Sequence, residues 1–131
     1  MEIKYSKEIP EIYWKCKEVF GVEWDKGIII TYGNIIYCKW DLDFFKTVHE
    51  ATHVKQQTEM DKDLWWDRYF ADKEFRLSQE VEAYQNEINF IKANIKDRNK
   101  RFLLINKVHK DISSYIYGNI ISFNEARALL K

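Results

Sequence analysis

Two histidines, His49 and His53, stand four residues apart in the stretch VHEATH, with Glu50 directly after the first. Successive residues of an α-helix turn by about 100°, so positions i and i+4 lie about 40° apart around the axis. On a helix the two imidazoles therefore point to one place in space, as two nitrogen ligands of a zinc ion must. Glu50 flanks the pair and is placed to reach a water molecule at the ion.

The alternative is a helix whose histidines are ordinary polar residues at the border of a core. The chain has three histidines, so chance spacing of this kind is rare. Leu42, Phe45 and Val48 form the apolar side of the predicted helix, which puts the histidine pair at its edge. We therefore predict a metal site.

A catalytic zinc site needs a third protein ligand and keeps one position open. The remaining histidine, His109, is far along the chain, so a carboxylate is the better candidate. In the segment KEFRLSQEVEAYQNEI, Glu80 borders an apolar stripe of helical period, Glu87 lies just outside it, and Glu82 lies on the opposite, solvent side. We predict Glu80 as the third ligand and Glu87 as the reserve, with a merely salt-bridged glutamate as the alternative.

The elements that position these residues follow from hydrophobic period and turn signals. We predict a helix over 7–20 with Pro10 in its first turn, ending near Gly21, and a β-hairpin over 27–40 that turns at Gly33. Asp41 is the expected N-cap of the histidine helix, which runs to about Thr58.

Downstream, the aromatic stretch MDKDLWWDRYFADKE shows no clear period, which indicates a loop or short turns packed by its rings. Trp65, Trp66, Tyr69 and Phe70 are less suited to lining a cleft than to packing that loop. The remaining predictions are a helix over 73–95, a helix over 97–117 stopped by Gly118, and a final short helix begun by a capping box of Ser122 and Glu125.

Length and composition set the class of the molecule. With 131 residues and 46% hydrophobic content, we expect residues 1–131 to form a single α+β domain, a small antiparallel sheet packed on the helices. Twenty-one basic residues balance twenty-one acidic ones, so no long-range field favours nucleic acid or anionic membrane as a partner. We find no secretory signal and no apolar run near the roughly 20 residues of a membrane span, and expect a cytoplasmic location with Cys16 and Cys38 reduced.

The stretches HEATHVKQQ and FRLSQEVEAY, in this order, resemble the gluzincin metallopeptidases, and among them the small minigluzincins, which include phage-type metallopeptidases. In that family the ligand glutamate commonly precedes an alanine by three residues, as Glu80 precedes Ala83. The family often has an aspartate next, which bonds a histidine from behind, whereas this chain has Tyr84. Tyr84, Gln56 or another group would then have to replace it.

The resemblance implies a zincin-like fold and one Zn²⁺ held by His49, His53 and Glu80, with Glu50 as the general base of peptide-bond hydrolysis. A peptide or protein substrate would pair with an edge strand, Ile35–Trp40 or its hairpin partner. Arg76, Tyr84 and His109 are conceivable second donors to the oxyanion, but each is better explained as structural. The competing hypothesis is a non-catalytic zinc-binding or protein-interaction module of the same fold.

Overall fold

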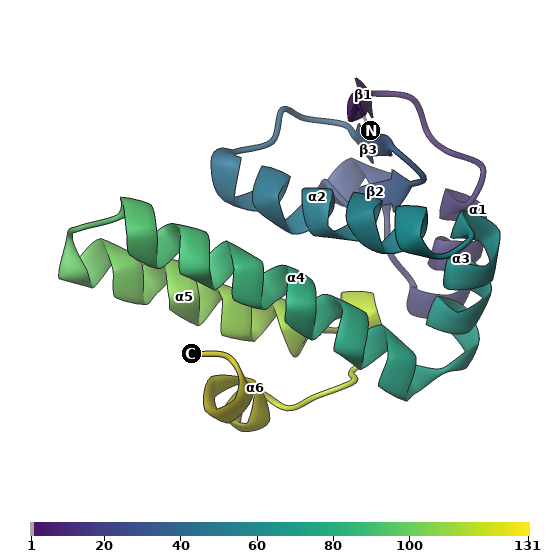
Figure 1. The fold of residues 1–131 in the computed structure, drawn as a ribbon. Coiled ribbons are helices and arrows are strands. Elements are labelled where there is room, and N and C mark those ends of the chain that lie inside the picture. The colour runs from purple at the N-terminus through teal and green to yellow at the C-terminus, as the bar shows by residue number, and fades with distance from the viewer. Residues whose placement is uncertain (1) are drawn as a thin grey trace.

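The computed structural model describes residues 2–131, which form six α-helices, two 3-10 helices and one three-stranded sheet (Figure 1). The α+β class expected from the sequence is therefore confirmed. In chain order the elements are β1 (Lys4–Ser6), α1 (Tyr13–Phe20), η1 (Trp24–Lys26), β2 (Ile29–Tyr32), β3 (Ile35–Cys38), α2 (Phe44–Glu59), α3 (Lys62–Ala71), α4 (Lys73–Asn94), α5 (Arg98–Ile112), η2 (Tyr115–Tyr117) and α6 (Phe123–Leu129).

The sheet has the strand order β1-β3-β2 and is mixed rather than antiparallel. The predicted hairpin is confirmed: β2 and β3 are antiparallel, and Gly33 turns the chain with a φ of 64°. Strand β1 was not predicted, and it pairs with β3 in parallel, with Tyr5 opposite Ile36. Only three residues form it, and each pairs with a residue 31 positions further along the chain, so no local pattern reveals the pairing.

The first helix is shorter than the predicted 7–20. It begins at Tyr13, whose N–H donates to Pro10 O in the turn that precedes the helix. Residues 7–9 instead lead out of strand β1, and Pro10 has no N–H to extend a ladder. The predicted end is confirmed, because Gly21 takes a left-handed φ of 73° and donates to Lys17 O.

The histidine helix α2 begins later than predicted, because Asp43 and not Asp41 is its N-cap. The carboxylate of Asp43 accepts from Lys46 N at 2.8 Å, and Asp41 lies outside the helix.

The aromatic stretch that we expected to be a loop is helix α3, capped by Asp61, which accepts from Leu64 N. The sequence of this helix shows no clear hydrophobic period, because Trp65, Trp66 and Tyr69 are all buried although they lie on neighbouring faces.

The C-terminal half is mainly helical, and α4 and α5 lie side by side (Figure 1). Helix α4 spans nearly the predicted range, but α5 ends at Ile112 rather than 117. Ser113 and Ser114 end it, because their hydroxyls donate to His109 O and Asp111 O and compete with the helical ladder. The predicted capping box of Ser122 and Glu125 is confirmed at the start of α6.

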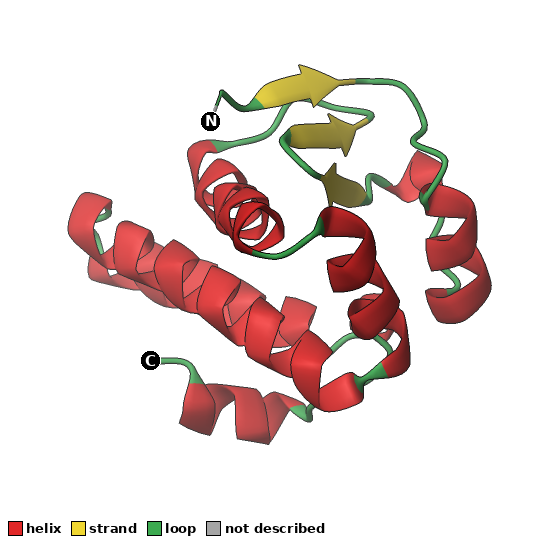
Figure 2. Cartoon of the chain, turned by 45° about the vertical axis from the view of Figure 1, so that its right-hand side comes forward, coloured by secondary structure: helices red, strands yellow, loops and turns green. Residues whose placement is uncertain are grey.

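Helix α2 lies between the sheet and α4 (Figure 2). Two hydrophobic clusters flank it, one built mainly of aromatic residues from α1, the sheet and α3, the other of aliphatic residues from α4, α5 and α6. Cys16 and Cys38 are both buried and free. In residues 2–131 no helix combines the length and the apolar character that a membrane crossing requires.

Candidate metal centre

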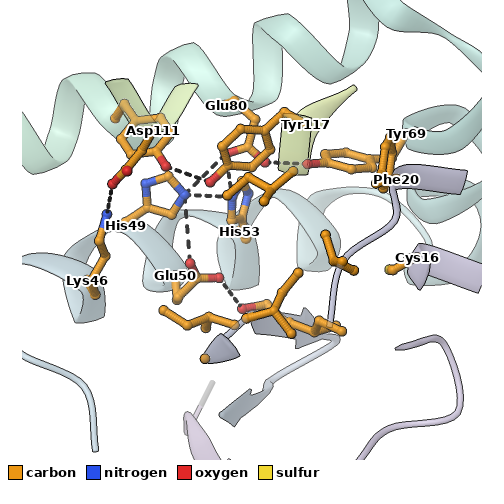
Figure 3. Close-up of a pocket in the computed structure, with 18 of the residues that line it drawn as sticks. Cys16, Phe20, Lys46, His49, Glu50, His53, Tyr69, Glu80, Asp111 and Tyr117 are labelled. Carbon is orange, nitrogen blue, oxygen red and sulfur yellow. Dashed lines mark hydrogen bonds and ion pairs between the residues drawn. The ribbon is translucent and has the colours of Figure 1, made fainter. Parts of the chain in front are cut away.

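The predicted residues His49, His53 and Glu80 meet in the interior, between α2 and α4. Their side chains point to one place from the two helices (Figure 3). His49 Nε2 and His53 Nε2 are 3.2 Å apart, and Glu80 Oε1 lies 3.1 Å from the first and 3.2 Å from the second. At most 5% of any of the three residues is exposed. Helical spacing and the face of Glu80 therefore place the three side chains as the sequence predicted.

The triangle of donor atoms fits a small divalent ion. Two ligands of a tetrahedral zinc ion bound at about 2.0 to 2.1 Å are separated by about 3.3 Å. The observed edges of 3.1–3.2 Å are close to this value without any rearrangement. Two imidazole nitrogens and one carboxylate oxygen also form a donor set that suits zinc and other transition metals.

The electrostatics of the cluster favour a cation. Burial opposes protonation of His49, but the carboxylates of Glu80 and Glu87 outweigh this effect and raise its pKa to about 9. Burial would by itself raise the pKa of Glu80, yet the adjacent imidazoles hold it well below its usual range. The cluster thus concentrates negative potential at one point, where a metal ion can take the place of the protons.

Glu50, the predicted general base, borders the cluster without joining it. Its Oε2 lies 3.7 Å from His49 Nε2, and the residue is 6% exposed. The other oxygen, Oε1, accepts a hydrogen bond of 2.9 Å from the hydroxyl of Thr31 on strand β2 (Figure 3). This bond fixes one oxygen of the carboxylate and leaves the other directed at the cluster.

The side-chain amide of Gln56 contacts His53 on the side of the ring that faces away from the cluster. His53 Nδ1 lies 2.8 Å from Gln56 Oε1, which can only accept, so in the neutral ring the proton is on Nδ1 and Nε2 presents its lone pair to the cluster. The amide is oriented in turn, because Gln56 Nε2 donates to Gln79 O and to Glu82 Oε1. Gln56 is thus one of the groups that the sequence suggested in place of the family's aspartate.

Aromatic residues of α3 hold the other side of the cluster. Tyr69 donates to Glu80 Oε2 at 2.6 Å, which leaves Oε1 for the histidines. The ring of Trp65 packs against His53 with centroids 5.6 Å apart, and its indole N–H donates to Gln79 Oε1. The expectation that these aromatics pack rather than line a cleft is correct only in part. They pack, in a helix rather than a loop, but Trp65, Trp66 and Tyr69 also line the cavity at the site, and Tyr69 orients a candidate ligand.

A second amide, Gln57, ties α2 to the edge of the sheet. Gln57 Nε2 donates to Thr31 O at 2.8 Å and Gln57 Oε1 accepts from Gly33 N at 2.7 Å, as a neighbouring strand would do. Trp66 Nε1 also donates to Thr31 O. The strand that carries Thr31 is therefore fixed relative to the helix that carries Glu50.

The other glutamates of α4 lie apart from the donor triangle. Glu87, the reserve ligand, faces the far side of His49, with Oε1 3.3 Å from Nδ1. Glu82 is exposed as predicted, although it reaches Gln56.

The three conceivable oxyanion donors have structural partners. His109 Nε2 lies 2.8 Å from Leu130 O between α5 and α6. Arg76 donates to Tyr69 O and Tyr117 O, and the Tyr84 hydroxyl pairs with that of Tyr117.

The cluster opens on a cavity of about 310 Å³. One wall is strand β2 with its preceding residues from Gly27, and the apolar end is lined by Phe20 and Val22. Lys46 and Asp111 lie at the opposite end (Figure 3), and Lys107 also lines the cavity. Strands β1 and β2 are the edges of the sheet and β3 is central, so Ile35–Trp40 does not supply an edge and its hairpin partner β2 does. Of the two edge strands, β2 is the one that lines the cavity.

Sequence reasoning missed Thr31, Gln57, Tyr69 and Lys46 as supports of the site. Each acts through a contact between elements distant in the chain, such as the pairing of Thr31 with Glu50. Two weak sequence signals pointed to supports of the site. Gln57 lies one helical turn after His53, and Glu87 lies two turns after Glu80 on the same face of its helix.

No protein-family model matches the chain, and neither do the curated proteins or the solved structures with which it was compared.

Proposed function

We propose that the chain is a zinc-dependent metallopeptidase of the minigluzincin kind, in which His49, His53 and Glu80 hold the ion and Glu50 is the general base. The observation that carries this proposal is the buried triangle of donor atoms with edges of 3.1–3.2 Å beside a further carboxylate. The same donor set serves iron sites as well as zinc sites. The carboxylate of Glu50, 3.7 Å from His49 Nε2, supports hydrolysis as the reaction and therefore zinc as the metal.

A bound zinc ion supplies a Lewis acid that polarises a peptide carbonyl and acidifies a water molecule. Glu50 is placed to accept a proton from that water and to deliver it to the leaving amine. Thr31 keeps the carboxylate in this position through its hydrogen bond to Oε1. Burial of the cluster excludes bulk solvent, which strengthens each of these electrostatic interactions.

An extended peptide is the substrate that the cavity fits best, because the edge of β2 forms its wall. Tyr32 and Ile35 close the two-residue hairpin, so the backbone groups of Ile29 and Thr31 point away from β3. Gln57 and Trp66 already bind Thr31 O. Main-chain pairing of a substrate therefore centres on Ile29 and on the N–H of Thr31.

The test combines metal analysis with proteolysis. Purified chain should contain about one zinc per molecule, and it should cleave members of a peptide library in a reaction that a chelator stops. Glu50→Gln should retain zinc and lose at least about 100-fold of the cleavage rate, because the general base is gone. Glu59→Gln, an exposed position on the same helix, is the matched control and should behave as the parent chain.

Three results would contradict the proposal. Iron in place of zinc would reassign the metal, and a chain without any metal would remove the site. Zinc at full occupancy with no cleavage, and no effect of Glu50→Gln on any function, would favour the non-catalytic module.

A further inference from the structure

Chemically different groups contact the Nδ1 atoms of the two histidines, on the side of each ring that faces away from the cluster. His53 Nδ1 contacts the neutral amide of Gln56 at 2.8 Å, on the side of the exposed Glu82. His49 Nδ1 faces a carboxylate instead, with Glu87 Oε1 3.3 Å away. That carboxylate is buried, with 3% of the residue exposed.

Glu87 belongs to a chain of charges that spans three helices. Lys46 Nζ, on α2, lies 3.5 Å from Glu87 Oε1 and 3.4 Å from Asp111 Oδ2 on α5. Lys107 completes the chain, with its Nζ 2.9 Å from Asp111 Oδ2. Figure 3 shows Lys46 and Asp111 beside His49, on the side away from His53. The charges alternate in sign along the chain, which offsets the cost of burying Glu87.

The position of the proton on His49 makes this contact important. A metal ion needs the lone pair of Nε2, so the proton of the neutral ring must then sit on Nδ1. Among residues 2–131, Nδ1 has no regular hydrogen-bond partner, and Glu87 is the carboxylate that faces it. The ring of Tyr84 packs on His49 with centroids 4.1 Å apart, which restricts reorientation of the imidazole toward another acceptor.

We propose that Glu87 is the positioning residue of His49, accepting the Nδ1–H when a metal ion is bound, and that Lys46 and Asp111 hold Glu87 in place. This inference rests on the proposed metal site. It makes Glu87 the hydrogen-bond partner of the ligand His49 rather than a reserve ligand. It also makes α5, which carries Asp111, a support of the metal centre.

Metal affinity measures this role directly. Zinc titration against a chromophoric chelator should show about 10- to 100-fold weaker binding by Glu87→Gln, since supports of this kind contribute that much to affinity. Glu74→Gln, at an exposed position on the same helix, should bind as the parent chain does. Lys46→Met should weaken binding in the parent chain and have little further effect when Glu87 is already glutamine.

A spectroscopic measurement separates positioning from general stability. In the zinc-bound parent chain, the ¹⁵N spectrum of the imidazoles should show His49 protonated on Nδ1, with a proton protected from exchange. In Glu87→Gln that proton should exchange faster, while the Nδ1 proton of His53 keeps its protection because Gln56 is unchanged.

The outcomes are distinct. Equal zinc affinity and equal His49 exchange in the parent chain and Glu87→Gln overturn the role of Glu87 and leave the metal site intact. No zinc binding by the parent chain overturns the metal site, and this inference with it. If circular dichroism shows that Glu87→Gln does not fold, Asp111→Asn decides, because it must still weaken zinc binding relative to the matched surface variant Asp67→Asn, at an exposed position outside the charge chain.

Discussion

The molecule has two cores of different chemistry, and the candidate metal centre lies between them. The aromatic core gathers around α3 and comprises Tyr13, Cys16, Val22, Trp24, Ile30, Trp65, Trp66, Tyr69 and Phe75. The aliphatic core joins α4, α5 and α6 and comprises Tyr84, Ile88, Ile91, Val108, Ile112, Ala126 and Leu130. Helix α4 belongs to both, and Glu80 lies on it between Phe75 and Tyr84.

The two cores support the site in different ways. Aromatic residues have apolar bodies and polar tips, so one side chain can pack and donate a hydrogen bond at once. Tyr69 donates to Glu80, and Trp66 donates to the backbone oxygen of Thr31, whose hydroxyl is the partner of Glu50. Apart from Tyr84, whose ring packs on His49, the residues of the aliphatic core have no such groups and hold α4 and α5 together by shape. The aromatic core should therefore affect metal binding directly, and the aliphatic side chains of the other core only through global stability.

The largest effect should come from Trp65→Ala in the aromatic core. Trp65 is 2% exposed, and replacing a buried aromatic by alanine costs about 3 to 5 kcal/mol of unfolding free energy. Urea unfolding in the presence of chelator measures this cost without a contribution from metal. Zinc affinity of the folded protein should also fall, because the indole packs against His53.

Trp14→Ala is the matched control, since Trp14 is 58% exposed. It should change the unfolding free energy by less than about 1 kcal/mol and leave zinc affinity unchanged. A Trp65→Ala chain that is destabilised but binds zinc as tightly as the parent would contradict the direct role of the aromatic core.

Ile112→Ala in the aliphatic core should destabilise the chain by about 3 kcal/mol, because Ile112, the last residue of α5, is fully buried against the neighbouring helices. Zinc affinity at low temperature, where the variant is folded, should equal that of the parent chain. Leu103→Ala, at a position on α5 that is 65% exposed, controls for the loss of a large apolar side chain. A loss of zinc affinity in Ile112→Ala comparable with that in Trp65→Ala would remove the distinction between the cores.

The same contrast explains what could be predicted from the sequence. The hairpin, the range of α4 and the convergence of His49, His53 and Glu80 follow from spacing within single elements, which local pattern reports well. The residues of α4 that enter the aliphatic core form one helical stripe, so they could be predicted from the hydrophobic period of that helix. Capping by Ser122 and Glu125 is equally local.

The aromatic core is harder to predict because its elements are short and buried on several faces. Helix α3 has neighbouring buried rings in place of a stripe, and β1 pairs with residues 31 positions away in the chain. The supports of the site are non-local for the same reason. Tyr69 meets Glu80 only because α3 folds back on α4, and Lys46 meets Glu87 and Asp111 only once three helices pack together.

The smallest effect should come from the far end of the aliphatic core, at the N-cap of α6. Ser122 Oγ accepts from Glu125 N, and the Glu125 carboxylate accepts from Ser122 N, so Ser122→Ala loses the first of two reciprocal bonds. We expect a loss of about 1 kcal/mol of unfolding free energy, and Ser122→Asp, which keeps an acceptor, should lose little of it.

Helix α6 and the residue after it contribute Ala126 and Leu130 to the aliphatic core, and the helix makes no hydrogen bond or ion pair with the donor triangle, so this variant tests how far the core's influence reaches. Amide exchange should quicken in α6 and leave α2 and α3 unchanged if fraying stays local. Zinc affinity should also be unchanged. Faster exchange in α3, or weaker zinc binding, would mean that the two cores respond as one unit and that the separation between a structural and a positioning core is wrong.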